Sequence, residues 1–409
     1  MKYSIVIPTY NNCEKYLKPC IDSIIKYTDM TDVELVISAN GCTDNTKAYL
    51  QYLKTAIPNI QWWWNEEPLG FAKATNVGIK ASKADKIVLL NNDTILLDQP
   101  KNKWLELLDQ GGVSGVLKQY SEITKRQFIV FFCAMIDKEV FDKIGLLNEE
   151  YATGGNEDIE FCLKAEQAEY WLNDCGNNGT FPIYHKAEGT MFDPELVPNW
   201  ANKFLLNQLK LAKKYNLEWY RWRLTNNYER AVFLKGDSVF PRETQRYEWA
   251  AKNLIGNKIL EIGCSTGYGV QFFPSDIDYL GLDYDPIIIE VAKEQNWLPT
   301  ANFSWADIND YELGQYDTIV AFEVIEHLDN GLEIAEKLKK HCNRLLLTVP
   351  HNEPKGFWGE HHKLHGITEK DFSGFQFTYI NMNGDISDVM QEITPENPAN
   401  LMICRWDRG

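Results

Sequence analysis

The chain contains no apolar run long enough to cross a membrane as a helix. None of its 409 residues lies in a stretch approaching the roughly 20 consecutive apolar residues that such a span requires. Residues 1–8 hold one lysine and a short β-rich run, which is too short for a secretory signal peptide. From these two absences we expect a cytoplasmic protein with no transmembrane segment.

Paired cysteines and an excess of basic charge are absent as well. The nine cysteines are scattered without Cys-x-x-Cys pairs, so buried, reduced thiols are expected rather than a disulfide framework. The formal net charge is -17, and a surface that acidic repels nucleic-acid phosphates and anionic lipids. We therefore expect no nucleic-acid partner, although one local metal-bearing pocket can still hold a diphosphate.

Two regions of the chain alternate strand-like and helix-like patterns. A chain of this length favours two domains, and strand–helix alternation predicts a mostly parallel sheet in each, with ligands at the carboxyl ends of the strands. We expect an α/β protein with two doubly wound domains, at residues 1–215 and 241–409, joined by a helical linker at 216–240. The main strands are expected at residues 4–8, 33–38, 60–64, 86–90, 181–184, 258–262, 279–283, 316–322 and 344–349.

Four polar segments in the first region stand at strand ends or open a helix. They are Pro8–Asn12, Asn91–Asp93, Gly154–Asp158 and His185. A departing diphosphate needs a divalent cation held by hard oxygen ligands, and an acceptor hydroxyl needs a general base. Each segment alone also has a structural explanation: a solvated turn, acids at a helix N-terminus, or a structural histidine.

Together and in this order, these segments closely resemble the family-2 glycosyltransferases, which have the GT-A fold. The similarity is greatest to the branch that includes rhamnosyl and related cell-surface polysaccharide transferases, and it covers about residues 1–195. It is carried by IVIPTYN at 5–11, NEEPLGFAKATNVGI at 65–79, LLNNDT at 89–94, FDKIGLLNEE at 141–150 and EDIEFCLK at 157–164.

The resemblance implies a role for each matching residue. Asp93 would hold Mn²⁺ or Mg²⁺ against the diphosphate, and His185 would complete the metal site. Asp158, with Glu157 as the other candidate, would deprotonate the acceptor hydroxyl, which fits an inverting one-step displacement. The residues expected to contact the nucleotide-sugar are Pro8, Thr9, Asn11, Asn40, Lys73, Asn76, Asn91 and Asn92.

The chain departs from the family pattern at two positions. Asn91 occupies the first position of the Asp-x-Asp motif, which removes one charge from the metal site. Ala39 replaces the aspartate that many relatives have before Asn-Gly, where it contacts the base or ribose. The second departure leaves the identity of the nucleotide open.

The second region opens with a strand that leads into a glycine-rich turn. The run ILEIGCSTGYG spans residues 259–269, and Asp283 ends the next expected strand. Such a turn lets the backbone approach a ligand, Glu261 can bind an amino group, and an acid at position 283 can accept ribose hydroxyls. An ordinary tight turn or a nicotinamide-type site would also produce this pattern.

The downstream sequence resembles the class I S-adenosylmethionine-dependent methyltransferases over about residues 240–350. It is carried by Trp305–Asp307 and by YDTIVAFEVIEHL at 316–328. The resemblance implies that Asp307 bonds the adenine amine and that Glu323, Glu326 and His327 follow the fourth strand, with His327 as the catalytic candidate. The residues expected to bind S-adenosylmethionine are Glu261, Gly263, Gly267, Asp283, Asp307 and Glu323.

Four further histidines lie beyond the resembling segment, at His351, His361, His362 and His365. Their spacing fits no standard zinc pattern, and no cysteine lies nearby. Metal binding, a cap over the acceptor pocket that supplies a base, and a structural role all remain open at this stage.

The two resemblances together predict a bifunctional enzyme of glycan or surface polysaccharide biosynthesis. It would transfer a sugar from a nucleotide-sugar to a glycan, lipid-linked or glycoprotein acceptor. It would also transfer a methyl group from S-adenosyl-L-methionine to a sugar hydroxyl. The alternative is an active glycosyltransferase whose C-terminal half is a non-catalytic cofactor-binding or positioning module.

Overall fold

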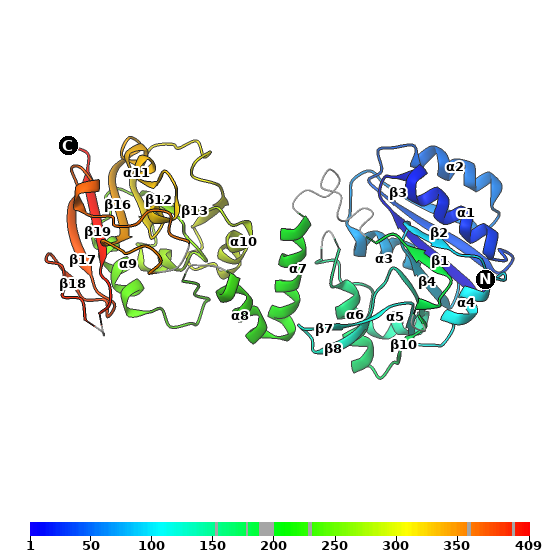
Figure 1. The fold of residues 1–409 in the computed structure, drawn as a ribbon. Coiled ribbons are helices and arrows are strands. Elements are labelled where there is room, and N and C mark those ends of the chain that lie inside the picture. Colours follow the sequence, from blue (N-terminus) through cyan, green and yellow to red (C-terminus); the bar gives the residue numbers. More distant parts are fainter. Residues whose placement is uncertain (152–153, 177–178, 188–199, 228–230, 358–360, 395–396) are drawn as a thin grey trace. The chain divides into compact units, whose positions relative to one another are not determined.

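The computed structural model describes residues 1–409 except 152–153, 177–178, 188–199, 228–230, 358–360 and 395–396 (Figure 1). The chain forms two compact units, Met1–Trp222 and Arg223–Gly409, and the division falls within helix α8 (Leu217–Asn227). Each unit has its own sheet and hydrophobic core, which confirms the predicted α/β architecture. Among the described residues, no helix is long and apolar enough to cross a membrane.

In its described part, the first unit is built on a seven-stranded sheet with the order β10-β6-β9-β4-β1-β2-β3. Strands β1 to β4 run parallel as predicted, whereas β9 is antiparallel to both β4 and β6. Two small antiparallel pairs, β5 with β11 and β7 with β8, lie outside this sheet. The strands are β1 (Tyr3–Thr9), β2 (Val33–Asn40), β3 (Ile60–Asn65), β4 (Lys86–Leu90), β5 (Thr94–Leu96), β6 (Val113–Gly115), β7 (Lys118–Ser121), β8 (Arg126–Ile129), β9 (Cys133–Asp137), β10 (Leu172–Asp174) and β11 (Ile183–His185).

Helices cover both faces of this sheet because apolar side chains alternate along its strands. On β1, Ile5 and Ile7 pack into a core with α1 and α2, whereas Val6 packs into a second core with α3, α5 and α6. Two-sided burial of this kind is typical of parallel strands in α/β proteins. The helical segments are η1 (Cys13–Leu17), α1 (Lys18–Tyr27), α2 (Thr46–Ala56), α3 (Phe71–Ala81), α4 (Lys103–Leu108), α5 (Lys138–Ile144), α6 (Glu157–Gln167) and α7 (Trp200–Tyr215).

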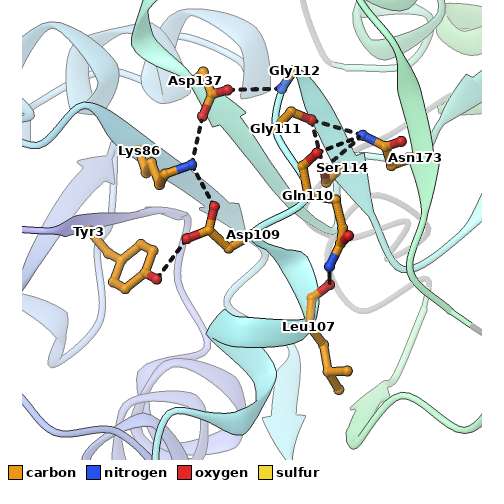
Figure 2. A network of polar contacts seen from close by, with 10 residues as sticks. All are labelled: Tyr3, Lys86, Leu107, Asp109, Gln110, Gly111, Gly112, Ser114, Asp137 and Asn173. Carbon is orange, nitrogen blue, oxygen red and sulfur yellow. Dashed lines mark hydrogen bonds and ion pairs between the residues drawn. The ribbon is translucent and has the colours of Figure 1, made fainter.

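A polar network fixes the edge of the sheet at which β1 and β4 begin (Figure 2). The Lys86 Nζ atom lies 2.5 Å from Asp109 Oδ1 and 3.2 Å from Asp137 Oδ1. The Tyr3 hydroxyl donates to Asp109, and the Gly112 backbone N–H donates to Asp137. The network ties β1, β4 and the end of β9 together, opposite the edge at which ligands bind in such sheets.

The second unit has an eight-stranded sheet in the described residues, ordered β14-β13-β12-β15-β16-β19-β17-β18. Its first five strands are parallel, and β19 then pairs antiparallel with β16 and β17. The strands are β12 (Lys258–Ile262), β13 (Asp278–Asp283), β14 (Asn302–Trp305), β15 (Tyr316–Phe322), β16 (Cys342–Pro350), β17 (Gln376–Ile380), β18 (Ile386–Ser387) and β19 (Leu401–Asp407). The helical segments are α9 (Pro241–Asn253), η3 (Tyr268–Phe272), α10 (Pro286–Gln295), η4 (Ile325–His327), α11 (Gly331–Lys339) and η5 (Glu369–Asp371).

The segment expected as a linker divides between several structures. Helix α8 occupies most of its first half, and residues 228–230 lie outside the described residues. Phe233 and Leu234 are buried, the Phe233 ring packs edge-on against Tyr268, and the Phe233 carbonyl accepts a bond from Thr266 Oγ1. Residues 231–240 therefore pack as part of the second unit.

All nine cysteines belong to the described residues, and every one is buried with a free thiol. This agrees with the reduced, buried thiols expected from their scattered positions.

Candidate active sites

Pairing of β5 with β11 brings the two predicted metal ligands of the first unit together. Residues Asn91–Asp93 follow β4, and β5 begins at the next residue, Thr94. His185 is the last residue of β11, rather than following a strand as predicted, and it stands opposite Thr94. Its Nε2 atom lies 3.2 Å from Asp93 Oδ1, so an imidazole and a carboxylate converge where the sequence pattern expected a cation.

The two asparagines before Asp93 differ in their environments. Asn92 Nδ2 donates to the buried Thr9 hydroxyl over 2.9 Å, which joins this loop to the end of β1. Asn91 Oδ1 is buried and has no hydrogen-bond partner within the described part of the chain. Asn91 stands two residues before Asp93 in the same loop, and an oxygen of this kind fits the ligand preferences of Mn²⁺ and Mg²⁺.

The consecutive residues Phe131 and Phe132 contact both predicted centres of the first unit. The Phe132 ring stacks on the His185 ring with 4.2 Å between centroids and 4° between planes, and the Phe132 carbonyl accepts the Asn91 N–H. The Phe131 backbone bonds to Asp158, an interaction that favours the ionised carboxylate and so lowers its pKa. The contact to Asp158 and the contact to His185 therefore come from two adjacent residues of one segment.

Glu157, which is buried, and Asp158, which is partly buried, form an acidic pair at the start of α6. Burial raises the pKa of Asp158 to about 6, although backbone bonds from Ile159 and Phe131 oppose the rise. Burial and the adjacent Asp158 raise the pKa of Glu157 to about 8. Glu157 therefore holds a proton more tightly than Asp158, and Asp158 is the member better suited to act as a base near neutral pH.

A third acid of the same helix, Glu160, was not singled out from the sequence. It is fully buried, and burial raises its pKa, but the surrounding donors outweigh that effect and lower the pKa to about 2. Its carboxylate contacts Asn148, Tyr151, Lys164, Lys214 and Tyr215. These bonds anchor α6 to the end of α7 and thereby hold Asp158 in place.

Helix α7 also fixes the glycine loop that precedes Glu157. Asn207 Nδ2 donates to the Gly154 carbonyl over 3.0 Å, and Lys210 Nζ donates to the Glu150 carbonyl over 3.2 Å. The loop itself includes residues 152–153, which lie outside the described residues.

The residues predicted to line the nucleotide lie at the carboxyl ends of β1 and β2. Pro8 and Thr9 end β1, and Asn11 adopts a left-handed backbone with φ 52°. The Asn11 side-chain oxygen accepts the Thr43 N–H, and Asn40 Oδ1 accepts the Leu69 N–H over 2.5 Å. These bonds join three loops at the edge where Asp93 also lies.

The two predicted donor contacts on α3 differ. Lys73 is exposed, as a cation that contacts a diphosphate must be. Asn76 is buried and bonds Leu147 through both backbone groups and Glu149 through its carboxylate. The Asn76 side chain therefore braces the segment after α5, and its contact with the donor stays a prediction.

In the second unit, the predicted cofactor residues gather at the carboxyl edge of the parallel strands. Gly263 follows β12 and Gly267 follows it in the turn, with φ angles of 70° and 72°. A Cβ atom at Gly263 would lie 2.5 Å from Val324, and one at Gly267 would lie 2.5 Å from Phe303. Both the backbone angle and the space therefore require glycine at these positions.

The acids of this edge end or follow neighbouring strands. Asp283 ends β13, is buried, and accepts the backbone N–H groups of Ser265 and Asp285. Asp307 follows β14, is exposed, and accepts the Asn309 N–H. Glu323 follows β15 with φ 55°.

Glu261 is surrounded by residues that sequence reasoning did not identify. Its two oxygens accept the Tyr247 and Tyr279 hydroxyls at 2.5 Å each, and burial raises its pKa to about 7 against these bonds. Arg246, on α9, is buried over the Phe322 ring, and its Nε and Nη1 atoms have no hydrogen-bond partner among the described residues. Because α9 precedes the motifs that carry the resemblance, no motif indicated Arg246 or Tyr247.

Comparisons with known families match both units. The family model for glycosyl transferase family 2 matches residues 4–127, and a family model described as a methyltransferase domain matches residues 260–344. Glycosyltransferase GlyG of Streptococcus pneumoniae is 30% identical over 107 residues, 26% of this chain and 34% of that protein. Glycosyltransferase AglE of Haloferax volcanii is 30% identical over 104 residues, 25% of this chain and 33% of that protein. The matched segments thus span about a third of these curated relatives.

Solved structures of both kinds are also similar to the chain, each at 15% identity. A mannosyltransferase from Pyrobaculum calidifontis in complex with GDP-Man and Mn²⁺ has a TM-score of 0.39 and covers 52% of this chain and 64% of its own. A magnesium protoporphyrin IX methyltransferase from Synechocystis with bound SAH has a TM-score of 0.32 and covers 47% and 95%. The family matches therefore identify a segment similar to glycosyl transferase family 2 in the first unit and a segment similar to a methyltransferase domain in the second.

Proposed function

We propose that this chain is a bifunctional enzyme that builds a methylated glycan or surface polysaccharide. The first unit would transfer a sugar from a nucleotide-sugar to a glycan acceptor with inversion, and the second would methylate a sugar hydroxyl. The observation that carries the first activity is the Phe131–Phe132 segment, which contacts Asp158 on one side and His185, beside Asp93, on the other. One short stretch of backbone would thus hold both the base and the cation site.

On the donor side, Asp93, His185 and the unused oxygen of Asn91 would hold Mn²⁺ or Mg²⁺. When bound, such a cation neutralises charge on the departing diphosphate. Thr9, Asn11 and Asn40 fix the loops that would contact the nucleotide, and Lys73 offers an exposed ammonium group to the diphosphate.

On the acceptor side, Asp158 would act as the general base. Its carboxylate takes the hydroxyl proton while the hydroxyl oxygen bonds the anomeric carbon and the bond to the diphosphate breaks. Glu157 keeps its proton at neutral pH, because its pKa is raised to about 8. Two negative charges are therefore avoided in this acidic pair at the pH of catalysis.

In the second unit, the carboxyl edge would bind S-adenosylmethionine, which supplies an electrophilic methyl group when bound. Asp283, at the end of β13, would accept the ribose hydroxyls, and the exposed Asp307 would accept the adenine amine. The methionine carboxylate would bind the Nε and Nη1 groups of Arg246, which have no hydrogen-bond partner among the described residues, although Nη1 lies 3.8 Å from Glu323 Oε1. The Arg246 guanidinium group lies over the Phe322 ring at the end of β15. Glu261 is the matching acid for the amino group.

Two measurements test the proposal. A thermal-shift screen of UDP-, GDP- and dTDP-sugars with Mn²⁺ should identify the donor, because ligand binding raises the melting temperature by mass action. Tritium transfer from labelled S-adenosylmethionine to a glycan should then appear only with the correct acceptor. Tight cofactor binding without label transfer to any glycosylated product would favour the alternative of a non-catalytic C-terminal module.

A further inference from the structure

One cluster of side chains in the second unit joins His327, the catalytic candidate expected from the sequence, to two residues that have no role in the proposed methyl transfer. Glu326, His327 and His362 each offer a ligand atom, and these atoms all lie within 4.8 Å of one another. Glu326 and His327 belong to η4, directly after β15, whereas His362 comes from the segment that follows β16. The rings of His327 and His362 meet edge-to-face with centroids 4.7 Å apart.

The Glu326 carboxylate is the least explained group of this cluster. The residue is 0% exposed, and neither of its carboxylate oxygens has a hydrogen-bond partner in the part of the chain that the structure describes. An ionised carboxylate buried without a partner costs several kcal/mol, so a native protein compensates it with a proton, a hydrogen bond or a cation. Two imidazoles beside it favour the cation.

The surrounding backbone holds the cluster in shape. The N–H groups of Lys363 and Leu364 donate to the Glu326 carbonyl over 2.7 and 3.0 Å, which fastens the segment carrying His362 against η4. The Nδ1 atom of His362 lies 2.5 Å from Glu353 Oε2, and Glu353 is itself buried. A carboxylate on one ring nitrogen of a histidine orients the other nitrogen toward a metal in many metal sites.

We propose that Glu326, His327 and His362 bind a divalent transition-metal ion of the Zn²⁺ type, with Glu353 as the residue that positions His362. Two imidazoles and one carboxylate form a donor set that suits Zn²⁺ and its first-row neighbours and leaves coordination positions for water or substrate. Mg²⁺ and Ca²⁺ prefer oxygen ligands and fit this set less well. This site is separate from the cation site proposed around Asp93.

The position of the cluster suggests that the bound metal ion takes part in methyl transfer, a role that rests on the proposed function. The cluster follows β15, whose neighbour β12 leads into the Gly263 turn expected to hold S-adenosylmethionine. A cation there would bind an acceptor hydroxyl and ease loss of its proton, a known action of catalytic metals. His327 would then act as a ligand to the cation rather than as a base.

Metal binding can be tested without cofactor or acceptor, so its outcome does not depend on the proposed function. Untagged full-length protein is stripped of metal and titrated with Zn²⁺, and bound metal is measured by equilibrium dialysis and mass spectrometry. We expect Glu326→Gln and His362→Gln each to lose one equivalent of Zn²⁺ and Glu353→Gln to bind that equivalent about 10- to 100-fold more weakly. The matched control is His351→Gln, because His351 also contacts a carboxylate, Glu369, but lies outside the cluster.

Two further readouts keep the result decisive. Asp93→Ala should leave the equivalent lost in Glu326→Gln untouched, which separates the two cation sites. If circular dichroism shows that Glu326→Gln is unfolded, the site is tested instead with His362→Gln. The visible spectrum of bound Co²⁺ is then compared between the unmutated protein and His362→Gln. Full retention of Zn²⁺ and of the Co²⁺ bands in folded His362→Gln and Glu326→Gln would overturn the site and leave Glu326 as a buried, protonated acid.

Discussion

Replacing Asp158 with asparagine is expected to slow glycosyl transfer about 10²- to 10⁴-fold, the usual contribution of a general base. Donor affinity should change little, because the donor is held by the metal loop and the β1 and β2 ends. The unmutated enzyme should also lose activity in acid, since a pKa of about 6 leaves Asp158 ionised at pH 7 and mostly protonated at pH 5. For one titrating group this is a fall of about tenfold in the ionised fraction.

Glu157→Gln is the matched control for this experiment. Glu157 is already neutral at pH 7, because burial and Asp158 raise its pKa to about 8. An amide of the same size should therefore preserve most of the rate and leave the acid limb of the pH profile near pH 6.

The assay is the single-turnover rate of sugar transfer from pH 5 to pH 8 at saturating donor and fixed Mn²⁺. Donor dissociation constants measured by calorimetry at each pH separate binding from chemistry. Near-full activity of Asp158→Asn together with an inactive Glu157→Gln would show that the two roles are reversed. An acid limb that persists in the residual activity of Asp158→Asn would refute the assignment of that limb to Asp158.

Three further outcomes are expected. Asp93→Ala should abolish the metal dependence of donor binding. His185→Ala should weaken that dependence less, because a neutral imidazole adds no charge to the site. Donor binding by the unmutated protein that is unchanged by a metal chelator would refute both expectations. Asp283→Ala should weaken S-adenosylmethionine binding about 10- to 150-fold, because it removes a hydrogen bond worth roughly 1.5–3 kcal/mol. Glycosyl transfer by this variant should persist. If the folded variant no longer transferred sugar, the two units would be functionally coupled. Glu160→Gln should lower the free energy of unfolding by about 2 kcal/mol in urea at pH 7, against little change in the exposed Glu166→Gln. Because the pKa of Glu160 is lowered to about 2 in the folded protein, ionised Glu160 stabilises the fold above about pH 4.5, and this contribution is lost as the pH falls toward 2. Equal urea midpoints for Glu160→Gln and Glu166→Gln at pH 7 would contradict this role.

The long parallel strands could be read from the sequence because their pattern is local. Runs of apolar residues predicted β4, β12 and β15 with the bounds that the structure has, and their neighbours within a few residues. Such strands are buried on both faces, so an apolar run bounded by turn residues identifies them. The position of most candidate residues at the carboxyl edges follows from this topology.

Features made by short or distant segments could not be read in the same way. Strand β5 has three residues, too few for a periodic signal, and the strand expected at 181–184 carried no sign of its pairing partner. Only the family resemblance therefore implied that His185 lies close to Asp93. The approach of His362 to Glu326 depends on how the segment after β16 returns to η4, and no spacing along the chain encodes it. The buried bracing role of Asn76 likewise depends on a loop that only the folded structure brings close.

The buried cysteines allow the unfolding of each unit to be followed by chemical labelling. Six of them lie in the first unit and three in the second, and burial raises the pKa of Cys20 and Cys342, one in each unit, to about 12. A thiol that is both shielded and protonated reacts with alkylating reagents only when its surroundings open. The protein can be pulse-labelled with iodoacetamide at each denaturant concentration and its mass then measured. Unfolding of the first unit should add up to six labels, and unfolding of the second unit should add up to three. If the units open independently, intermediate masses with one complete set should appear; cooperative opening of the whole chain would pass directly from none to nine.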